Sequence, residues 1–285
     1  MTFNVTALIL RQEDWRETDA WVTMYTRERG KIEALAKGLR KIESKLASHL
    51  EPFMTAEIFL AQGRHWPIVA GSIVEQARLG LRDNFDRLSL AGAIARLADL
   101  MTPLESRDDN IYDVLDETLA IIESNHLKQS AGELLLHLFA WKLLVFSGYH
   151  PELKFCLRCK RNSIIGEAYL DIRRGGAIHE SCIYREAPRL YPAPPRRGGL
   201  HRDGGGETPH RPAPPSGAGA LGQESTTMPI GQAALRGLSY MATASIRDAL
   251  RLRGTDKSFR QINRAIALFV EERYEQPISF INAQQ

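Results

Sequence analysis

The sequence is poor in cysteine and has no long apolar run. Only three cysteines occur among its 285 residues, and no stretch of apolar residues is long enough to cross a bilayer, which takes about 20 residues. The first residues lack a basic segment ahead of a continuous apolar one, so we expect no secretory signal. With 44% hydrophobic and 25% charged residues, the composition predicts a soluble cytoplasmic protein of two or three small domains, whose thiols stay reduced.

A large charge excess is also missing. The formal net charge is +3, which alone would not indicate nucleic-acid binding. Its distribution is more informative, because residues 75–150 are acidic whereas the segments on either side carry the basic excess. A Walker-type G-x4-G-K-[ST] motif is absent as well, so any ATP-driven step must belong to a partner.

All three cysteines gather in one short segment. Cys156 and Cys159 form a C-x2-C pair, and after a spacer of nineteen residues His179 and Cys182 form an H-x2-C pair. Three thiolates and one imidazole complete a tetrahedral shell, and each pair can sit on a tight turn so that both members reach one ion. The pattern therefore predicts one structural Zn2+ ion bound by these four residues. The alternatives are incidental thiols and, for His179, an ordinary surface or hydrogen-bonded histidine.

The first eighty or so residues have the pattern of short strands. Runs rich in β-branched and aromatic residues, several with period-two alternation, are separated by turn signals such as Arg29-Gly30 and Gln62-Gly63. The expected strands are residues 5–10, 20–26, 31–37, 53–61 and 66–74. Five short antiparallel strands must close or be covered to protect their edges, so we expect a five-stranded OB-fold barrel, which commonly binds single strands.

From about residue 80 the apolar period becomes helical. Three stripes precede Gly148 and Pro151, and helical pattern returns after residue 230, where the last helices should pack back on the earlier ones. Between them, the Pro/Gly/Arg-rich range 187–229 has almost no large apolar residues, so we expect it to be disordered. The fold class is thus α+β multidomain, an OB-fold barrel followed by an α-helical domain carrying a small zinc-binding segment. The expected domains are 1–79, 80–150 and 230–285 (one helical domain in two parts), 151–186 (zinc) and 187–229 (linker).

A basic cluster lies within the expected barrel. Its members, the candidate DNA-binding residues, are Arg27, Arg29, Lys31, Lys37, Arg40, Lys41 and Lys45. Such a local excess of positive charge provides a surface suited to binding a phosphate backbone. The alternative without a function is a charged face that is only solvated. Nearby aromatic residues that can stack on bases are Trp15, Trp21, Tyr25 and Trp66, and the alternative is that most of them are core or barrel-face residues, which the sequence does not distinguish.

An ordered series of motifs resembles the bacterial DNA repair protein RecO family. In the barrel region the series comprises Ala7-Leu-Ile-Leu-Arg11, Glu17-Thr18-Asp19, Tyr25-Thr26-Arg27-Glu28, Gly30-Lys31, Ala36-Lys37-Gly38-Leu-Arg40, Ser44-Lys-Leu46 and Leu50-Glu51-Pro52-Phe53. It continues in Phe146-Ser-Gly148-Tyr149-x-Pro151, Ser245-Ile-Arg247 and Leu252-Arg253-Gly254-Thr255. The resemblance covers most of the chain outside the Pro/Gly-rich range.

The resemblance implies a non-enzymatic recombination mediator of the bacterial cytoplasm and nucleoid. Proteins of this family bind single- and double-stranded DNA, anneal complementary strands, contact single-strand-binding protein and, with RecR, help load the RecA recombinase at gaps. Many zinc-bearing members use four cysteines, whereas His179 takes the third place here. The range 187–229 replaces the region that in this family helps connect the zinc segment to the last helices. Two explanations remain, a tolerated insertion and an altered reading frame.

Two readings from other classes compete with a mediator. A zinc hydrolase or nucleobase deaminase needs an H-x-E motif ahead of its cysteine pair, but here the order is reversed and Glu180 directly follows His179. A zinc-ribbon transcription regulator is the stronger alternative. It would show strong preference for one duplex sequence, because a protein that contacts only phosphates and stacked bases shows little.

Overall fold

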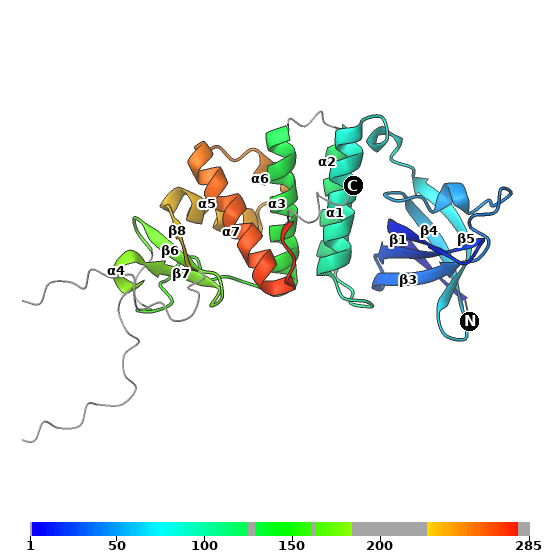
Figure 1. Ribbon diagram of the computed structural model, residues 1–285, viewed down its shortest axis with the longest axis horizontal. Coiled ribbons are helices and arrows are strands. Elements are labelled where there is room, and N and C mark those ends of the chain that lie inside the picture. The colour runs from blue at the N-terminus through cyan, green and yellow to red at the C-terminus, as the bar shows by residue number, and fades with distance from the viewer. Residues whose placement is uncertain (1, 125–128, 161–163, 184–226, 279–285) are drawn as a thin grey trace, which may run out of the picture.

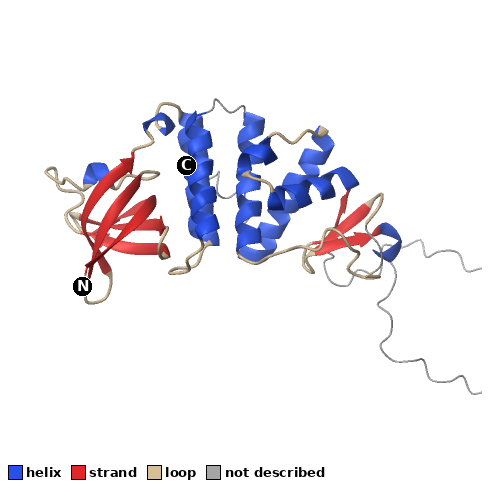
Figure 2. Cartoon of the chain, turned by 180° about the vertical axis from the view of Figure 1, so that it is seen from behind, coloured by secondary structure: helices blue, strands red, loops and turns tan. Residues whose placement is uncertain are grey.

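The computed structural model describes residues 2–124, 129–160, 164–183 and 227–278. Three parts follow one another along an elongated molecule: a barrel at one end, helices in the middle and a small sheet at the other end (Figures 1 and 2). None of the helices in these described ranges is both long and apolar enough to span a membrane.

The N-terminal part is a closed five-stranded barrel. Its strands are β1 (Thr2–Trp15), β2 (Asp19–Thr26), β3 (Gly30–Ala36), β4 (Thr55–Gln62) and β5 (Pro67–Gln76), in the order β1-β2-β3-β5-β4. All pairings are antiparallel except β3 with β5, which meet in parallel at Leu35 and Ile68. The predicted OB-fold barrel is confirmed.

The first strand runs five residues beyond its predicted end at Leu10. A register shift between Ile9 and Arg11 marks a bulge, after which β1 continues to pair with β2 as far as Trp15. The polar run that follows Leu10 hides this extension from a hydrophobicity pattern, because here pairing with β2 rather than burial keeps the chain extended.

The apolar run at the start of the chain is buried on both sides. Ile9 points into the barrel interior, whereas Leu8 and Leu10 belong to the same apolar core as the helices. Successive strand residues face opposite sides, so a strand packed between the barrel interior and a helix needs apolar residues at consecutive positions.

The central part contains helices from both halves of the chain. They are α1 (Phe85–Met101), α2 (Asp109–Ser124), α3 (Gln129–Phe146), α5 (Gln232–Thr243), α6 (Ile246–Leu250) and α7 (Asp256–Tyr274), and a short 3-10 turn at Leu79–Leu81 precedes α1. A second 3-10 turn, Ala47–His49, lies in the barrel between β3 and β4. Asn84 and Thr255 cap α1 and α7 by accepting backbone N–H bonds. The ring centroids of Trp141 on α3 and Phe269 on α7 are 5.9 Å apart, and Trp141 Nε1 donates a 3.1 Å hydrogen bond to the Leu238 carbonyl of α5. The last helices therefore pack on the earlier ones, as expected.

The third part is a small sheet. It consists of β6 (Ala168–Asp171), β7 (Gly176–His179) and β8 (Thr227–Ile230) in the order β7-β6-β8, followed on the β7 side by α4 (Glu180–Ile183). Strand β8 corrects the predicted disorder of 187–229 at residues 227–229, because Met228 is buried and the strand completes the sheet against β6. The remainder of that range, 187–226, lies outside the described residues.

Polar contacts and close packing join the barrel to the helices. The Lys31 ammonium donates to the Asp99 carbonyl (2.5 Å) and carboxylate (3.1 Å), and Arg11 Nε donates to the same carboxylate at 2.7 Å. Arg78 is buried and pairs with Asp116. A Cβ atom on Gly30, whose φ is +71°, would lie 2.0 Å from the Ser106 carbonyl oxygen, so only glycine permits this approach.

Candidate metal centre and nucleic-acid interface

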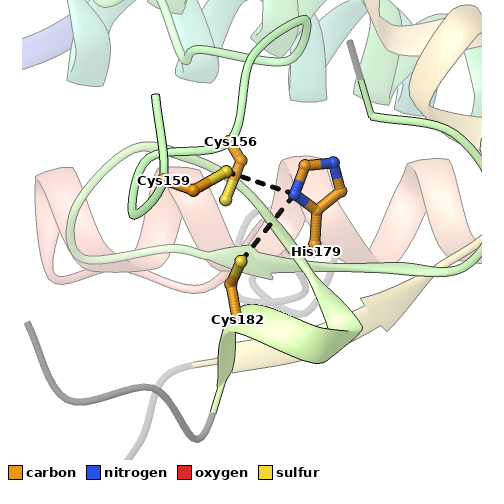
Figure 3. Close-up of side chains that lie close together, drawn as sticks. All are labelled: Cys156, Cys159, His179 and Cys182. Atoms are coloured by element: carbon orange, nitrogen blue, oxygen red, sulfur yellow. Dashed lines mark hydrogen bonds between the residues drawn. The ribbon is translucent and has the colours of Figure 1, made fainter. Parts of the chain in front are cut away.

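Two separate backbone features carry the cysteine and histidine pairs. Cys156 and Cys159 lie on a turn closed by the Lys160 N–H, which donates to the Cys156 carbonyl at 3.0 Å. His179 is the last residue of β7, and Cys182 lies in the short helix α4 that follows. The Leu157 N–H donates to the Ala177 carbonyl at 2.9 Å and so holds the turn against β7. Both pairs consequently face one point (Figure 3).

The distances between the ligand atoms fit one tetrahedral ion. All four atoms lie within 4.8 Å of one another. Nδ1 of His179 lies 3.5 Å from Sγ of Cys159 and 3.9 Å from Sγ of Cys182. With Zn–S near about 2.3 Å and Zn–N near about 2.0 Å, the sulfur-to-nitrogen edge of a tetrahedron is about 3.6 Å. The arrangement can therefore hold a metal ion, and four protein ligands leave no position for a reacting water.

The electrostatics of the thiols favour cation binding. Burial alone would raise the pKa of Cys156, but backbone N–H hydrogen bonds, those of Cys159 and His179 foremost, lower that pKa to about 6. Burial and then the charge of Cys156 raise the pKa of Cys182. One thiolate is thus available at neutral pH, and the charge of a bound ion would favour deprotonation of the others.

Three members of the basic cluster face the helices. Arg27 pairs with Asp113 at 2.9 Å, and Arg29 approaches Glu105 at 3.6 Å. Both side chains keep more than two fifths of their surface exposed, at 46% and 43%. The Lys31 side chain is only 11% exposed and is held by Asp99. This enclosure argues against a DNA contact by Lys31. Its side chain instead links the barrel to the helices.

The other four members lie in the connection between β3 and β4, residues 37–54. Lys37, Arg40, Lys41 and Lys45 are all exposed. The connection is pinned to the barrel where the Gly38 N–H donates to the Asp19 carboxylate at 2.8 Å and the Arg40 N–H to the Thr18 carbonyl at 2.9 Å. Within the described residues, Arg40 pairs with Asp14, whereas the three lysines form no salt bridge. We call residues 37–45 the basic loop.

The structure sorts the aromatic residues that the sequence leaves unsorted. Tyr25 is fully buried against the helices. Trp15, Trp21 and Trp66 instead lie together on the barrel surface, with Trp15 43% and Trp66 57% exposed. The ring centroids of Trp15 and Trp21 are 6.0 Å apart, and those of Trp21 and Trp66 are 5.5 Å apart.

One exposed cation near these rings is absent from the sequence prediction. Arg64 lies in the turn between β4 and β5, two residues before Trp66, and its side chain is exposed. It stands far from the basic cluster in the sequence. The available signal was its place in a turn between two predicted strands, beside a tryptophan.

Comparisons with known proteins place two family regions within the first 198 residues of the chain. Residues 1–76 match the family described as Recombination protein O N terminal, and residues 82–198 match Recombination protein O C terminal. A DNA repair protein RecO of Dehalococcoides mccartyi strain 195 is 32% identical over 180 residues, which cover 63% of this chain and 70% of the relative. The RecO protein of Alkaliphilus metalliredigens is 28% identical over 182 residues, covering 64% and 72%, and that of Heliobacterium modesticaldum 30% identical over 197 residues, covering 67% and 70%.

The matches to both family regions confirm the resemblance carried by the barrel motifs. The same chain has an OB-fold barrel, a helical region after it, and a group of four residues that could hold a metal ion. The chain therefore belongs to the RecO family of DNA repair proteins.

Proposed function

We propose that this protein is a recombination mediator without catalytic activity of its own. It binds single- and double-stranded DNA, anneals complementary strands and, with RecR, helps load RecA onto gaps covered by single-strand-binding protein. Its place of action is the bacterial cytoplasm, at the nucleoid. The observation that carries DNA binding is the basic loop, whose three lysines have no salt bridge to any described residue and lie exposed on a closed barrel.

Phosphate contacts are assigned to Lys37, Arg40, Lys41 and Lys45. Lys37, Lys41 and Lys45 form no salt bridge to a described residue, so they can contact a phosphate backbone without first losing an ion pair, whereas Arg40 must first release Asp14. Arg27 and Arg29 would have to give up contacts to Asp113 and Glu105, so they contribute less. Lys31 is left out of the path because its ammonium is enclosed.

Annealing follows from charge neutralisation without hydrolysis. Two complementary strands repel one another as polyanions, and a cationic surface that covers phosphates lowers that barrier. The base edges must stay free for pairing, and a flexible lysine side chain that contacts only phosphate leaves them so. No step of this proposal requires a bound nucleotide.

The metal is proposed to be one structural Zn2+ ion held by Cys156, Cys159, His179 and Cys182. Sulfur-rich tetrahedral ligand sets favour zinc among common cations. When bound, the ion would tie the turn after α3 to β7 and α4. The division into domains at 1–79, 80–150, 151–186 and 230–285 is likewise proposed.

Binding, annealing and metal content measured on one purified sample test the proposal. We expect binding to unrelated single strands, faster annealing of complementary oligonucleotides and one zinc per chain. Failure to bind or anneal would overturn the mediator role. Strong preference for one duplex sequence would support the zinc-ribbon transcription regulator instead.

A further inference from the structure

We propose that Trp15, Trp21 and Trp66, which we call the tryptophan face, form a base-stacking site for single-stranded DNA. This inference rests on the proposed function and deepens it, because it assigns the preference for single strands to particular side chains. The basic loop then supplies phosphate contacts that serve single strands and duplexes alike.

The tryptophan face lies where an OB-fold barrel receives a single strand. Trp15 ends β1 beside the β1–β2 connection, Trp21 lies on β2, and Trp66 precedes β5 in the β4–β5 connection. Oligonucleotides bind OB-folds on the face of strands 2 and 3 and at these two connections. Residues separated by about fifty positions in the sequence thus meet at the expected binding surface.

Packing within the protein does not account for these rings. Trp66 is 57% exposed and Trp15 43% exposed, whereas Trp141 in the helical core is 1% exposed. Trp21 and Trp66 meet at 88° and Trp15 and Trp21 at 69°, both edge-to-face. An edge-to-face contact covers one face of one ring, so ring surface remains for a stacked base.

An exposed cation lies beside the rings. Arg64 belongs to the same connection as Trp66 and is exposed. Arg40 of the basic loop pairs at 3.0 Å with Asp14, which faces the opposite side of β1 from Trp15 because successive strand residues alternate. Exposed rings beside a cation suit a strand whose bases and phosphates are both accessible, whereas a duplex keeps its bases stacked inside. The position of the rings at the oligonucleotide-binding connections of an OB-fold, together with Arg64, favours single-stranded DNA over an apolar protein segment.

The contributions of the two surfaces are separable by salt. Contacts to phosphate release counterions and set the slope of log affinity against log salt, whereas stacking releases none. Loss of an indole should therefore lower single-strand affinity without changing that slope. Duplex affinity should stay the same.

The test compares Trp66→Ala and Trp15→Ala with Trp66→Phe, which keeps a ring. Binding of oligothymidylate and of a blunt duplex is measured by fluorescence anisotropy over a range of salt concentrations. We expect each alanine variant to weaken oligothymidylate binding by about 5-fold to about 150-fold at an unchanged slope. Trp66→Phe should stay close to the wild type. Because Trp141 is buried, quenching of intrinsic fluorescence by oligothymidylate should report on the tryptophan face.

Three outcomes would overturn the inference. In the first, both alanine variants bind oligothymidylate with wild-type affinity, whereas alanine substitutions in the basic loop weaken binding. That result would refute the stacking site but not the proposed mediator function. Another is an equal loss for oligothymidylate and duplex. In the third, the wild type self-associates in sedimentation, and the alanine variants lose this self-association without a change in DNA affinity. The tryptophan face would then be a contact between two copies of the protein. Absence of DNA binding by the wild type would instead refute the proposed function. Melting curves verify that the variants fold.

Discussion

Replacing Asp99 by alanine should loosen the junction between the barrel and the helices. The Asp99 carboxylate accepts from Arg11 at 2.7 Å and from Lys31 at 3.1 Å, and its side chain is 22% exposed. Lys31 also caps the end of α1 by donating to the Asp99 carbonyl at 2.5 Å, a favourable place for a cation. After the substitution this lysine keeps the carbonyl but loses its carboxylate in an enclosed position.

The magnitude follows from the degree of enclosure. Breaking one side of a fully buried ion pair costs about 3 to 5 kcal/mol. Arg11 is 34% exposed and keeps Glu33 at 3.3 Å, so most of the cost falls on Lys31. We therefore expect the free energy of unfolding to fall by about 2 to 3 kcal/mol for Asp99→Ala. Lys31→Met should cost less, because Asp99 then keeps Arg11.

Urea unfolding followed by circular dichroism measures the difference. The matched control is Asp14→Ala, which removes the partner of Arg40 in a pair whose aspartate is 71% exposed. Surface pairs of this kind contribute about 0 to 1 kcal/mol. If Asp99→Ala destabilised the protein no more than Asp14→Ala, the argument that Lys31 is a structural residue rather than a DNA contact would fail.

Metal removal and pH provide further tests. Chelation or Cys159→Ser should raise amide hydrogen exchange in the described residues of the range 151–183 while the barrel keeps its protection, because metal binding and local folding are coupled; equal exchange with and without chelator would contradict this. Metal retention should fall as the pH decreases, because protons compete with the ion for the three thiolates and for the His179 imidazole, and retention that does not depend on pH would argue against these ligands. Burial lowers the pKa of His137 below its usual 6.5, so the unfolded state binds a proton first, and stability should fall as the pH decreases through 6.5 towards the folded value. The variant His137→Gln should show a flatter decline in urea unfolding between pH 7 and pH 5, and an unchanged decline would assign it to other groups.

Local patterns in the sequence were sufficient for the main elements and for the candidate metal site. Period-two and helical repeats locate the five barrel strands and the long helices, because burial on one face imposes those periods. The C-x2-C and H-x2-C pairs identify the four residues that the structure brings together as a possible metal site, because the spacing within each pair is itself the geometric requirement.

The sequence alone does not show which cations and aromatic residues are exposed and which are buried or paired, because that depends on the fold. Lys31 and Lys41 belong to the same basic run, but Lys31 meets Asp99, which lies 68 positions away, whereas Lys41 faces solvent. Nothing local distinguishes them. Likewise β8 follows a Pro/Gly-rich range, and its strand conformation depends on pairing with β6 rather than on its own composition.

The DNA path along the basic loop is the central claim, and a charge-matched pair of variants tests it most directly. One variant replaces Lys37, Arg40, Lys41 and Lys45 by alanine, and the control replaces Arg253, Lys257, Arg260 and Arg264, which are exposed at or before α7. Both variants lose the same charge. Annealing rate and single-strand affinity are measured as a function of salt concentration.

We expect the basic-loop variant to lower affinity for all sequences alike, to slow annealing and to flatten the log-log salt slope by about 0.7 per lost contact, or about 3 in total. The control should keep the wild-type slope. A folded basic-loop variant that anneals complementary strands at the wild-type rate and salt dependence would contradict the account. It would move the DNA site elsewhere, first to the basic residues of the candidate metal segment, Arg158, Lys160, Arg173, Arg174 and Arg161, the last of which lies outside the described residues.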